Sequence, residues 1–203
     1  YVKASPAIPI TNLVNIFDAD AFKDEVDRLK SDSAKADTIA HRTQLEIKAR
    51  MADDPEFYKR FSELLDEVIK AFREGRIRAL EYLGKVTEIM HKVMHRTGDD
   101  IPKTLCDNDV AKAYVGVIKK IVASEDLPDK ENVIGDMALE IDKIIDNDRI
   151  VDWAFNVDVQ NKMKIDIEDC IYEYMQSKGF NLQFEAIDEI LDKCLDIAKR
   201  RKP

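Results

Sequence analysis

The chain has 203 residues, of which 45% are hydrophobic and 36% are charged. This length allows one domain with a sizeable core or two small ones. A formal net charge of −9 at pH 7 argues against a protein that holds nucleic acid by bulk electrostatics. Six Gly and six Pro leave long uninterrupted segments, and this favours an all-α fold.

The first 17 residues carry Pro6 and Pro9 among small and apolar side chains. We expect residues 1–17 to form an extended connector from a preceding domain, and residues 18–203 to form a single helical domain. Tyr1 is not an initiator residue, so we expect the chain to be a piece of a longer protein.

No apolar run approaches the ~20 residues that span a bilayer, and no export signal opens the chain, so we expect no membrane association and a cytoplasmic protein. Three cysteines are present, with no C-x-x-C pair: Cys106, Cys170 and Cys194. We expect them to be reduced thiols, with Cys170 and Cys194 on apolar helix faces.

Apolar residues at spacings of three and four predict eight helices. Their expected ranges are 19–29, 34–51, 55–74, 76–96, 108–123, 132–147, 157–177 and 184–200. Isolated helices of this kind are marginal, so each must bury one face against its neighbours. The sequence therefore predicts an all-α protein, an irregular multi-helix bundle of about eight helices.

The helix at 55–74 has the clearest signals. Its expected apolar stripe is Phe57, Phe61, Leu64, Leu65, Val68, Ile69 and Phe72. An Asp cap precedes Pro55 at the first helical position, and Gly75 is placed to stop or kink the helix. We expect inward-facing residues on the preceding helix at Ile39, Leu45, Ile47 and Met51, and on the following helix at Ile77, Leu80, Leu83, Val86, Met90, Val93 and Met94.

Local signals in the second half are fewer. Asp107 or Asn108 is expected to cap the helix at 108–123, and Gly179 to end the helix at 157–177 in a left-handed conformation. Val151 to Phe155 is the only short strand-like piece. Within it, Trp153 is expected to fill the core between helices, with an interface anchor as the alternative.

A basic segment lies at residues 70–96, with seven Lys or Arg against three Glu. Cations clustered on a helix can contact phosphates or an acidic partner, although a solvated helix face gives the same pattern. The candidate contact residues for DNA or a partner are Arg73, Arg76, Arg78, Lys85, Lys92 and Arg96.

Two patterns could indicate metal. Glu88, His91 and His95 lie on one side of a predicted helix, as in half of a di-iron carboxylate site. The second Glu-x-x-His of such a site is missing. A small metal-binding helical enzyme is therefore the least favoured alternative. Residues 107–109 and 146–148 resemble fragments of a calcium loop without its central Gly and closing Glu. We predict no catalytic, cofactor or metal site in this chain.

Catalytic motifs of nucleotide and nucleic-acid enzymes are also missing from the sequence. The six Gly residues are isolated, so no phosphate-binding loop is present. The acid-x-Lys match at residues 46–48 lies inside a predicted helix and lacks the preceding Pro-Asp pair of a nuclease centre. Neither an ATPase nor a nuclease motif can be assigned.

Two segments carry a resemblance to a known family. ADTIAHRT at residues 36–43 is followed by ARMADDPEFYKRFSELL at 49–65, and IVDWAFNVDVQNKMKIDIEDCIYEYMQSKGF occupies 150–180. Together, over roughly residues 15–200, they resemble the C-terminal helical domain of the R (restriction) subunit of type I restriction-modification enzymes. Residues 163–166 and 179–181 depart from the Lys/Arg-rich, Tyr-Pro-ending version of many relatives, which weakens any inference of DNA contact there.

The resemblance implies a role beyond this chain. The family's full subunit is an ATP-dependent DNA translocase and endonuclease that uses ATP and Mg. Its C-terminal domain is implicated in assembly with the methyltransferase and specificity subunits. By this resemblance we expect a non-catalytic assembly domain, with DNA present in the assembled complex.

Overall fold

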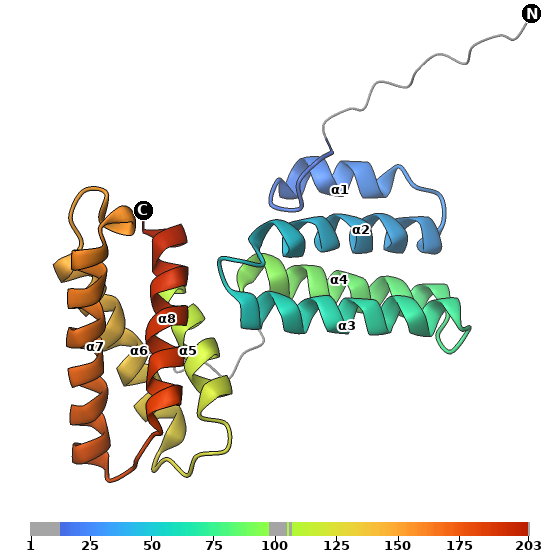
Figure 1. Cartoon of the computed structure of the whole chain (residues 1–203). Coiled ribbons are helices and arrows are strands. Elements are labelled where there is room, and N and C mark those ends of the chain that lie inside the picture. The colour runs from blue at the N-terminus through green and yellow to red at the C-terminus, as the bar shows by residue number, and fades with distance from the viewer. Residues whose placement is uncertain (1–12, 98–104, 106, 203) are drawn as a thin grey trace, which may run out of the picture. The chain divides into compact units, whose positions relative to one another are not determined.

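The computed structural model describes residues 13–97, 105 and 107–202, and within these ranges the fold is entirely helical. Within the described ranges, eight α-helices and the 3-10 helix η2 follow in chain order (Figure 1). They are α1 (Ala19–Asp27), α2 (Asp32–Arg50), α3 (Pro55–Arg73), α4 (Ala79–His95), α5 (Asp109–Ile121), α6 (Lys130–Asp148), η2 (Trp153–Phe155), α7 (Val157–Lys178) and α8 (Phe184–Arg201). The predicted all-α fold with eight helices is confirmed.

Packing divides the chain into two compact units. Of the described residues, 13–48 and 61–97 form the first unit, and 49–60, 105 and 107–202 form the second. The boundary falls within α2 and within α3. The single domain predicted for residues 18–203 stays a prediction, and of the connector predicted at 1–17 only residues 13–17 lie within the described part, where Ile16 is fully buried.

The first unit is built on α1, α2, α4 and the greater part of α3. Its fully or nearly fully buried side chains include Ile16, Phe22, Ile39, Ile47, Phe61, Leu65, Tyr82, Val86 and Val93. Phe72 stacks on Tyr82 with ring centroids 4.3 Å apart, and the Tyr82 hydroxyl donates a hydrogen bond to Asp37 Oδ1 at 3.2 Å. This aromatic pair therefore joins α3, α4 and α2.

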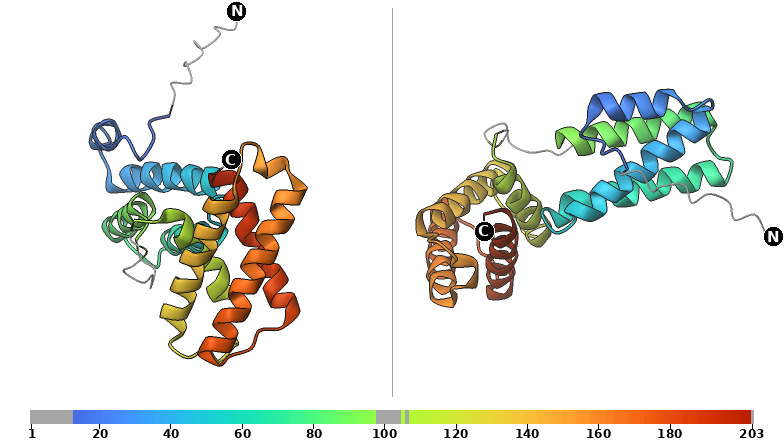
Figure 2. Two further views of the ribbon diagram at one scale, coloured as in Figure 1. Left: turned by 90° about the vertical axis from the view of Figure 1, so that its left-hand side faces the viewer. Right: turned by 90° about the horizontal axis from the view of Figure 1, so that it is seen from above.

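The second unit is a four-helix arrangement of α5 to α8. Helix α5 packs against α6 and α8, and α7 packs against α6 and α8, so consecutive helices are neighbours and the last closes on the first (Figures 1 and 2). Its core includes Tyr114, Ile118, Ile134, Met137, Ile141, Trp153, Met163, Ile167, Ile190 and Cys194. The first turn of α3 belongs to this unit, with Lys120 on α5 paired to Glu56 at 2.8 Å.

Cap residues place the helix ends. Asp54 is buried, and its Oδ1 accepts a hydrogen bond from the Phe57 N–H at 3.2 Å, so it caps α3. Asn108 caps α5 by accepting from two backbone N–H groups, and Gly179 ends α7 at φ 73°. The cap predicted at Asp107 or Asn108 is Asn108, and the left-handed end predicted at Gly179 is confirmed.

Three inward-facing predictions and the predicted strand-like piece need correction. Leu45 and Leu64 are each 40% exposed, and Leu80 is 71% exposed. Gly75 adopts φ 70° and α4 starts only at Ala79, so Leu80 lies in the first turn of α4 and outside the core. The strand-like piece at Val151–Phe155 is a turn followed by a 3-10 helix, with Asp152 at φ 59°.

No helix in the described ranges is long and apolar enough to cross a membrane.

Candidate partner-binding surfaces

The predicted basic segment covers the end of α3, the following turn and the whole of α4. Ion pairs offset part of its charge. Lys85 lies 3.1 Å from Glu81, and Lys92 lies 2.6 Å from Glu88. Arg78, Lys85 and Lys92 recur at a seven-residue spacing, so the same side of α4 alternates cations with these two acids. The pattern is that of a salt-bridged, solvated helix face.

The remaining arginines of this segment do not converge on one point. Arg76 pairs with Glu74 at 2.7 Å in the turn after α3, and Arg96 is the left-handed C-cap of α4 at φ 51°. Arg73 and Arg78 are exposed and form no ion pair with another described residue. The assignment of these six cations to a contact with DNA or a partner stays a prediction.

The candidate metal residues on α4 are engaged in other contacts or exposed. Glu88 accepts a hydrogen bond from Lys92, which lowers the pKa of that carboxyl. The His91 and His95 rings are exposed and stack with centroids 6.2 Å apart. Over the described part of the chain, no group of three or more metal-type side chains is close enough to hold an ion.

The fragments that resemble calcium loops have structural partners. Asn108 caps α5, and Asp109 pairs with Lys112 at 2.8 Å. In the second fragment, Asp146 lies 2.7 Å from Lys202, and Asp148 lies 2.6 Å from Lys162. Capping and ion pairing therefore account for four of the six residues in these fragments, Asn108, Asp109, Asp146 and Asp148.

A buried polar network ties the second unit together at one end. Lys202 Nζ lies 2.7 Å from Asp142 Oδ1, and Asp142 is only 6% exposed. The amide of Asn108 donates to the other carboxylate oxygen of Asp142 at 2.7 Å. The start of α5, the middle of α6 and the end of α8 are thus joined through one carboxylate.

The connection between α6 and α7, residues 149–156, is attached to this network and is called the α6–α7 loop below. Trp153 is buried, and its indole N–H donates to the main-chain carbonyl of Lys202 at 2.7 Å. The side-chain amide of Gln160 donates to the carbonyls of Trp153 and Ala154 at 3.3 Å and 2.8 Å. The burial of Trp153 agrees with the prediction that this side chain fills the core.

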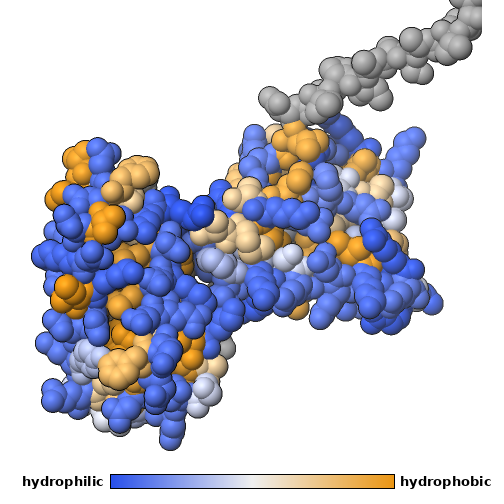
Figure 3. All heavy atoms as spheres, viewed as in Figure 1, coloured by the Kyte–Doolittle hydropathy of each residue, from blue (hydrophilic) through white to orange (hydrophobic). Residues whose placement is uncertain are grey.

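Large apolar side chains surround this anchored tryptophan on the outside. Val151 is 89% exposed and Phe155 is 88% exposed, and Ile150 and Val157 are exposed as well. Figure 3 shows hydrophobic atoms gathered at the end of the second unit where the α6–α7 loop lies. Contiguous exposed apolar groups are typical of surfaces that bind other proteins.

A model of the family described as type I restriction enzyme HindI endonuclease subunit-like, C-terminal, matches residues 11–200. The chain belongs to this family. No curated protein and no solved structure matches the chain.

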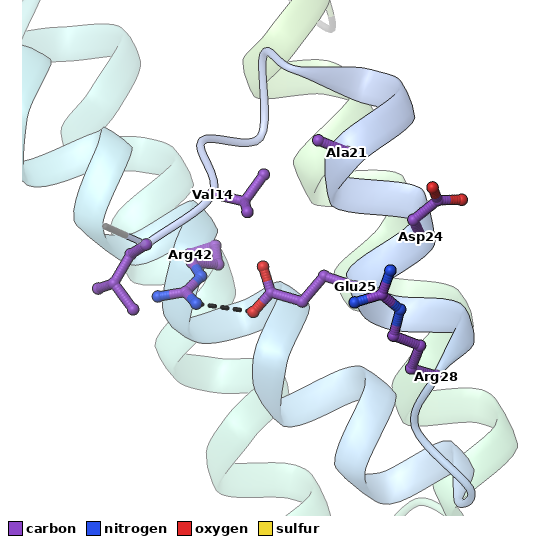
Figure 4. Close-up of a pocket in the computed structure, with 7 residues that line it drawn as sticks. Val14, Ala21, Asp24, Glu25, Arg28 and Arg42 are labelled. Atoms are coloured by element: carbon purple, nitrogen blue, oxygen red, sulfur yellow. Dashed lines mark hydrogen bonds and ion pairs between the residues drawn. The ribbon is translucent and has the colours of Figure 1, made fainter. Parts of the chain in front are cut away.

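The motifs that suggested the restriction-enzyme family lie at ordered positions in the structure. In the first, Arg42 on α2 donates to Glu25 on α1 at 2.8 Å, and the Arg42 side chain is only 10% exposed. This ion pair borders a hollow of about 450 Å³ in the first unit (Figure 4). Its lining residues are Leu13, Val14, Ala21, Asp24, Glu25, Arg28 and Arg42.

The second motif of the restriction-enzyme domain begins in the α6–α7 loop. Sequence reasoning did not select Ile150, Val151, Phe155 and Val157 as surface residues. The available signal was a stretch rich in apolar residues between two helices, where polar turn residues are usual. A stretch of this composition predicts a buried segment or a strand. The sequence does not show that only Trp153 within it is buried.

The cysteines of the restriction-enzyme domain behave as core residues where they are described. Cys170 and Cys194 are free and buried. Burial raises the pKa of the Cys170 thiol to about 11, and it raises that of Cys194 as well. Both thiols are therefore protonated and unreactive near neutral pH. Cys106 lies outside the described residues.

Proposed function

We propose that this domain is a non-catalytic assembly module that joins the R subunit of a cytoplasmic type I restriction enzyme to its methyltransferase and specificity subunits. The observation that carries this proposal is the apolar, solvent-exposed α6–α7 loop, which is held by partly buried hydrogen bonds of Trp153 and Gln160. The family match supplies the restriction-enzyme context.

The anchoring of the loop favours binding. A binding element that is already ordered loses little conformational freedom on association, and this raises affinity for a given contact area. Exposed aromatic side chains such as Phe155 are frequent energetic centres of protein interfaces. The α6–α7 loop combines both properties.

The chemistry of the parent subunit belongs, in this proposal, to other domains. ATP and Mg would be bound by the motor and nuclease domains of the full subunit. This chain would hold those domains on a complex that is bound to its DNA site, so that translocation starts from a fixed point. ATPase or nuclease activity in the purified chain would contradict the non-catalytic role.

A second candidate function is direct contact with DNA in the assembled complex. It is favoured by Arg73 and Arg78, which are exposed and form no ion pair with another described residue, in a segment with four more basic than acidic residues. The ion pairs of Lys85 and Lys92 reduce the strength of such a contact. This function is compatible with the first.

Competition tests the assembly role. The purified chain, added in excess to the full-length R subunit and the methyltransferase–specificity core, should occupy the core and prevent the R subunit from joining it on a native gel. An unchanged yield of the complete complex at saturating chain would contradict the proposal.

A further inference from the structure

We propose that the α6–α7 loop is itself the docking element, and that it enters an apolar hollow with a basic rim on a partner protein. This inference rests on the proposed function and adds to it a contact site and a partner chemistry. The residues that enter the hollow are Ile150, Val151, Phe155 and Val157.

The loop has the shape of a knob because its centre is tied inward. Trp153 is buried and bonded to the carbonyl of Lys202, while Val151 and Phe155 on either side are almost fully exposed. Asn156 caps α7 by accepting from the N–H groups of Asp158 and Val159, which fixes the exit of the loop. A convex apolar element of this kind buries its side chains fully only in a concave partner.

A further exposed apolar residue lies on α7, separated from the loop by polar residues. Val157 is 65% exposed and Ile165 is 58% exposed, eight residues further along the same helix. Residues separated by about two turns lie on a common side of an α-helix. Asn161 and Lys162 are exposed between Val157 and Ile165, so the partner hollow is expected to cover the loop and the start of α7 only.

Acidic residues outnumber basic ones along the chain on either side of the loop. Between positions 146 and 162 the chain carries Asp146, Asp148, Asp152 and Asp158 against Arg149 and Lys162. Arg149 pairs with Asp146 at 3.3 Å, and Lys162 pairs with Asp148 at 2.6 Å. Asp152 and Asp158 are exposed and form no ion pair with another described residue. On the α8 side of the loop, Lys202 is paired with Asp142 and Asp146, so Asp152 and Asp158 leave negative charge beside the apolar side chains.

The negative rim selects the class of partner. A nucleic acid or an anionic lipid surface would be repelled by Asp152 and Asp158. A symmetric contact between the loops of two copies of this chain would bring two acidic rims together, and like charges across an interface are unfavourable. A protein hollow lined with apolar groups and bordered by Lys or Arg satisfies both the apolar residues and the charges.

Binding measurements with the immobilised methyltransferase–specificity core from the same genome, without DNA, test this inference. Phe155→Asp and Val151→Asp should each weaken binding about tenfold or more, because each places a charge inside an apolar contact. Phe184→Asp is the matched control: Phe184 is 72% exposed but begins α8, at the opposite end of α7 (Figure 1). The affinity of the Phe184→Asp variant for the core should stay within about twofold of the wild-type affinity.

The charge of the rim is tested separately. Asn tolerates the left-handed backbone of Asp152, so the double variant Asp152→Asn, Asp158→Asn keeps the loop geometry and removes two charges. It should lower the association rate about two- to fivefold at low salt, and the difference should vanish at high salt. An association rate that is unchanged or higher in the double variant would contradict the proposal that the partner's hollow has a basic rim.

The outcomes separate the two proposals. If the wild-type chain binds, and Phe155→Asp and Val151→Asp bind with the same affinity as the control Phe184→Asp, the docking role of the loop is overturned. The assembly function then still stands. No binding by the wild-type chain would overturn both. If the chain self-associates in sedimentation experiments and Phe155→Asp abolishes this self-association, a second copy of the chain binds the loop. That result also overturns the inference.

Discussion

Trp153 donates its indole N–H to the main-chain carbonyl of Lys202, 49 residues further along the chain, at 2.7 Å. The same Lys202 pairs through its side chain with Asp142 and Asp146 on α6. The α6–α7 loop, α6 and the end of α8 are therefore joined at one residue. This junction holds the apolar side chains of the loop in place on the surface.

Trp153→Phe removes the donor while keeping an aromatic ring in the core. The carbonyl of Lys202 loses its partner and a small cavity remains, so we expect the free energy of unfolding to fall by about 1–3 kcal/mol. Urea denaturation followed by circular dichroism measures this change. A midpoint equal to that of the wild type would show that the bond has no stabilising role.

Lys202→Met tests the buried ion pair. It leaves the carboxylate of Asp142 buried with only the Asn108 amide beside it, and we expect a loss of about 3 kcal/mol of stability. Lys162→Met is the control, because the Lys162 side chain is exposed and its pairs with Asp148 and Asp166 should contribute less than about 1 kcal/mol. Equal losses in the two variants would contradict the importance of burial at Asp142.

Tyr82 gives the first unit a dependence on alkaline pH. Burial, and then the neighbouring Asp37, raises the pKa of Tyr82 from 10.0 to about 12. The folded state therefore retains this proton more strongly than the unfolded state. The stabilisation that comes from the raised pKa of Tyr82 is fully present below pH 10 and is lost as the pH rises from 10 to 12.

Tyr82→Phe should show a flatter decline of stability across this window. Its stability at pH 8 should be lower than that of the wild type, since the hydrogen bond to Asp37 is lost. Denaturant midpoints of both proteins between pH 8 and 12 give the comparison. Parallel curves would mean that Tyr82 does not titrate differently in the folded and unfolded states.

Charge reversal in the basic segment tests the second candidate function. We expect weak binding to duplex DNA that disappears at moderate salt. Arg78→Glu should reduce it more than Arg76→Glu, because Arg76 already pairs with Glu74. Fluorescence anisotropy with a labelled duplex measures both, and DNA binding that neither variant changes would exclude contact through this segment.

Helix positions were largely predictable from the sequence because the apolar spacing and the caps agree. Pro55 begins α3 as predicted, and Gly179 ends α7. Leu80 was misplaced because spacing alone does not show that α4 starts at Ala79, and the first turn of a helix projects beyond its neighbours more readily than its middle.

The candidate surface was less predictable. Trp153 is buried and bonded to Lys202, a contact between positions far apart in the sequence, while Phe155 two residues later is exposed. Local apolar patterns do not distinguish an anchored surface loop from a buried strand. For the basic segment, the sequence showed the charges on α4, and the structure added the pairing of Lys85 and Lys92 with acids on the same helix.

The most direct test of the assembly role is a pull-down of the methyltransferase–specificity core with this chain, in the presence and absence of DNA. We predict stoichiometric capture without DNA, since the proposed contact is an apolar loop with an acidic rim. Capture only when DNA is present, or no capture under either condition, would contradict the account.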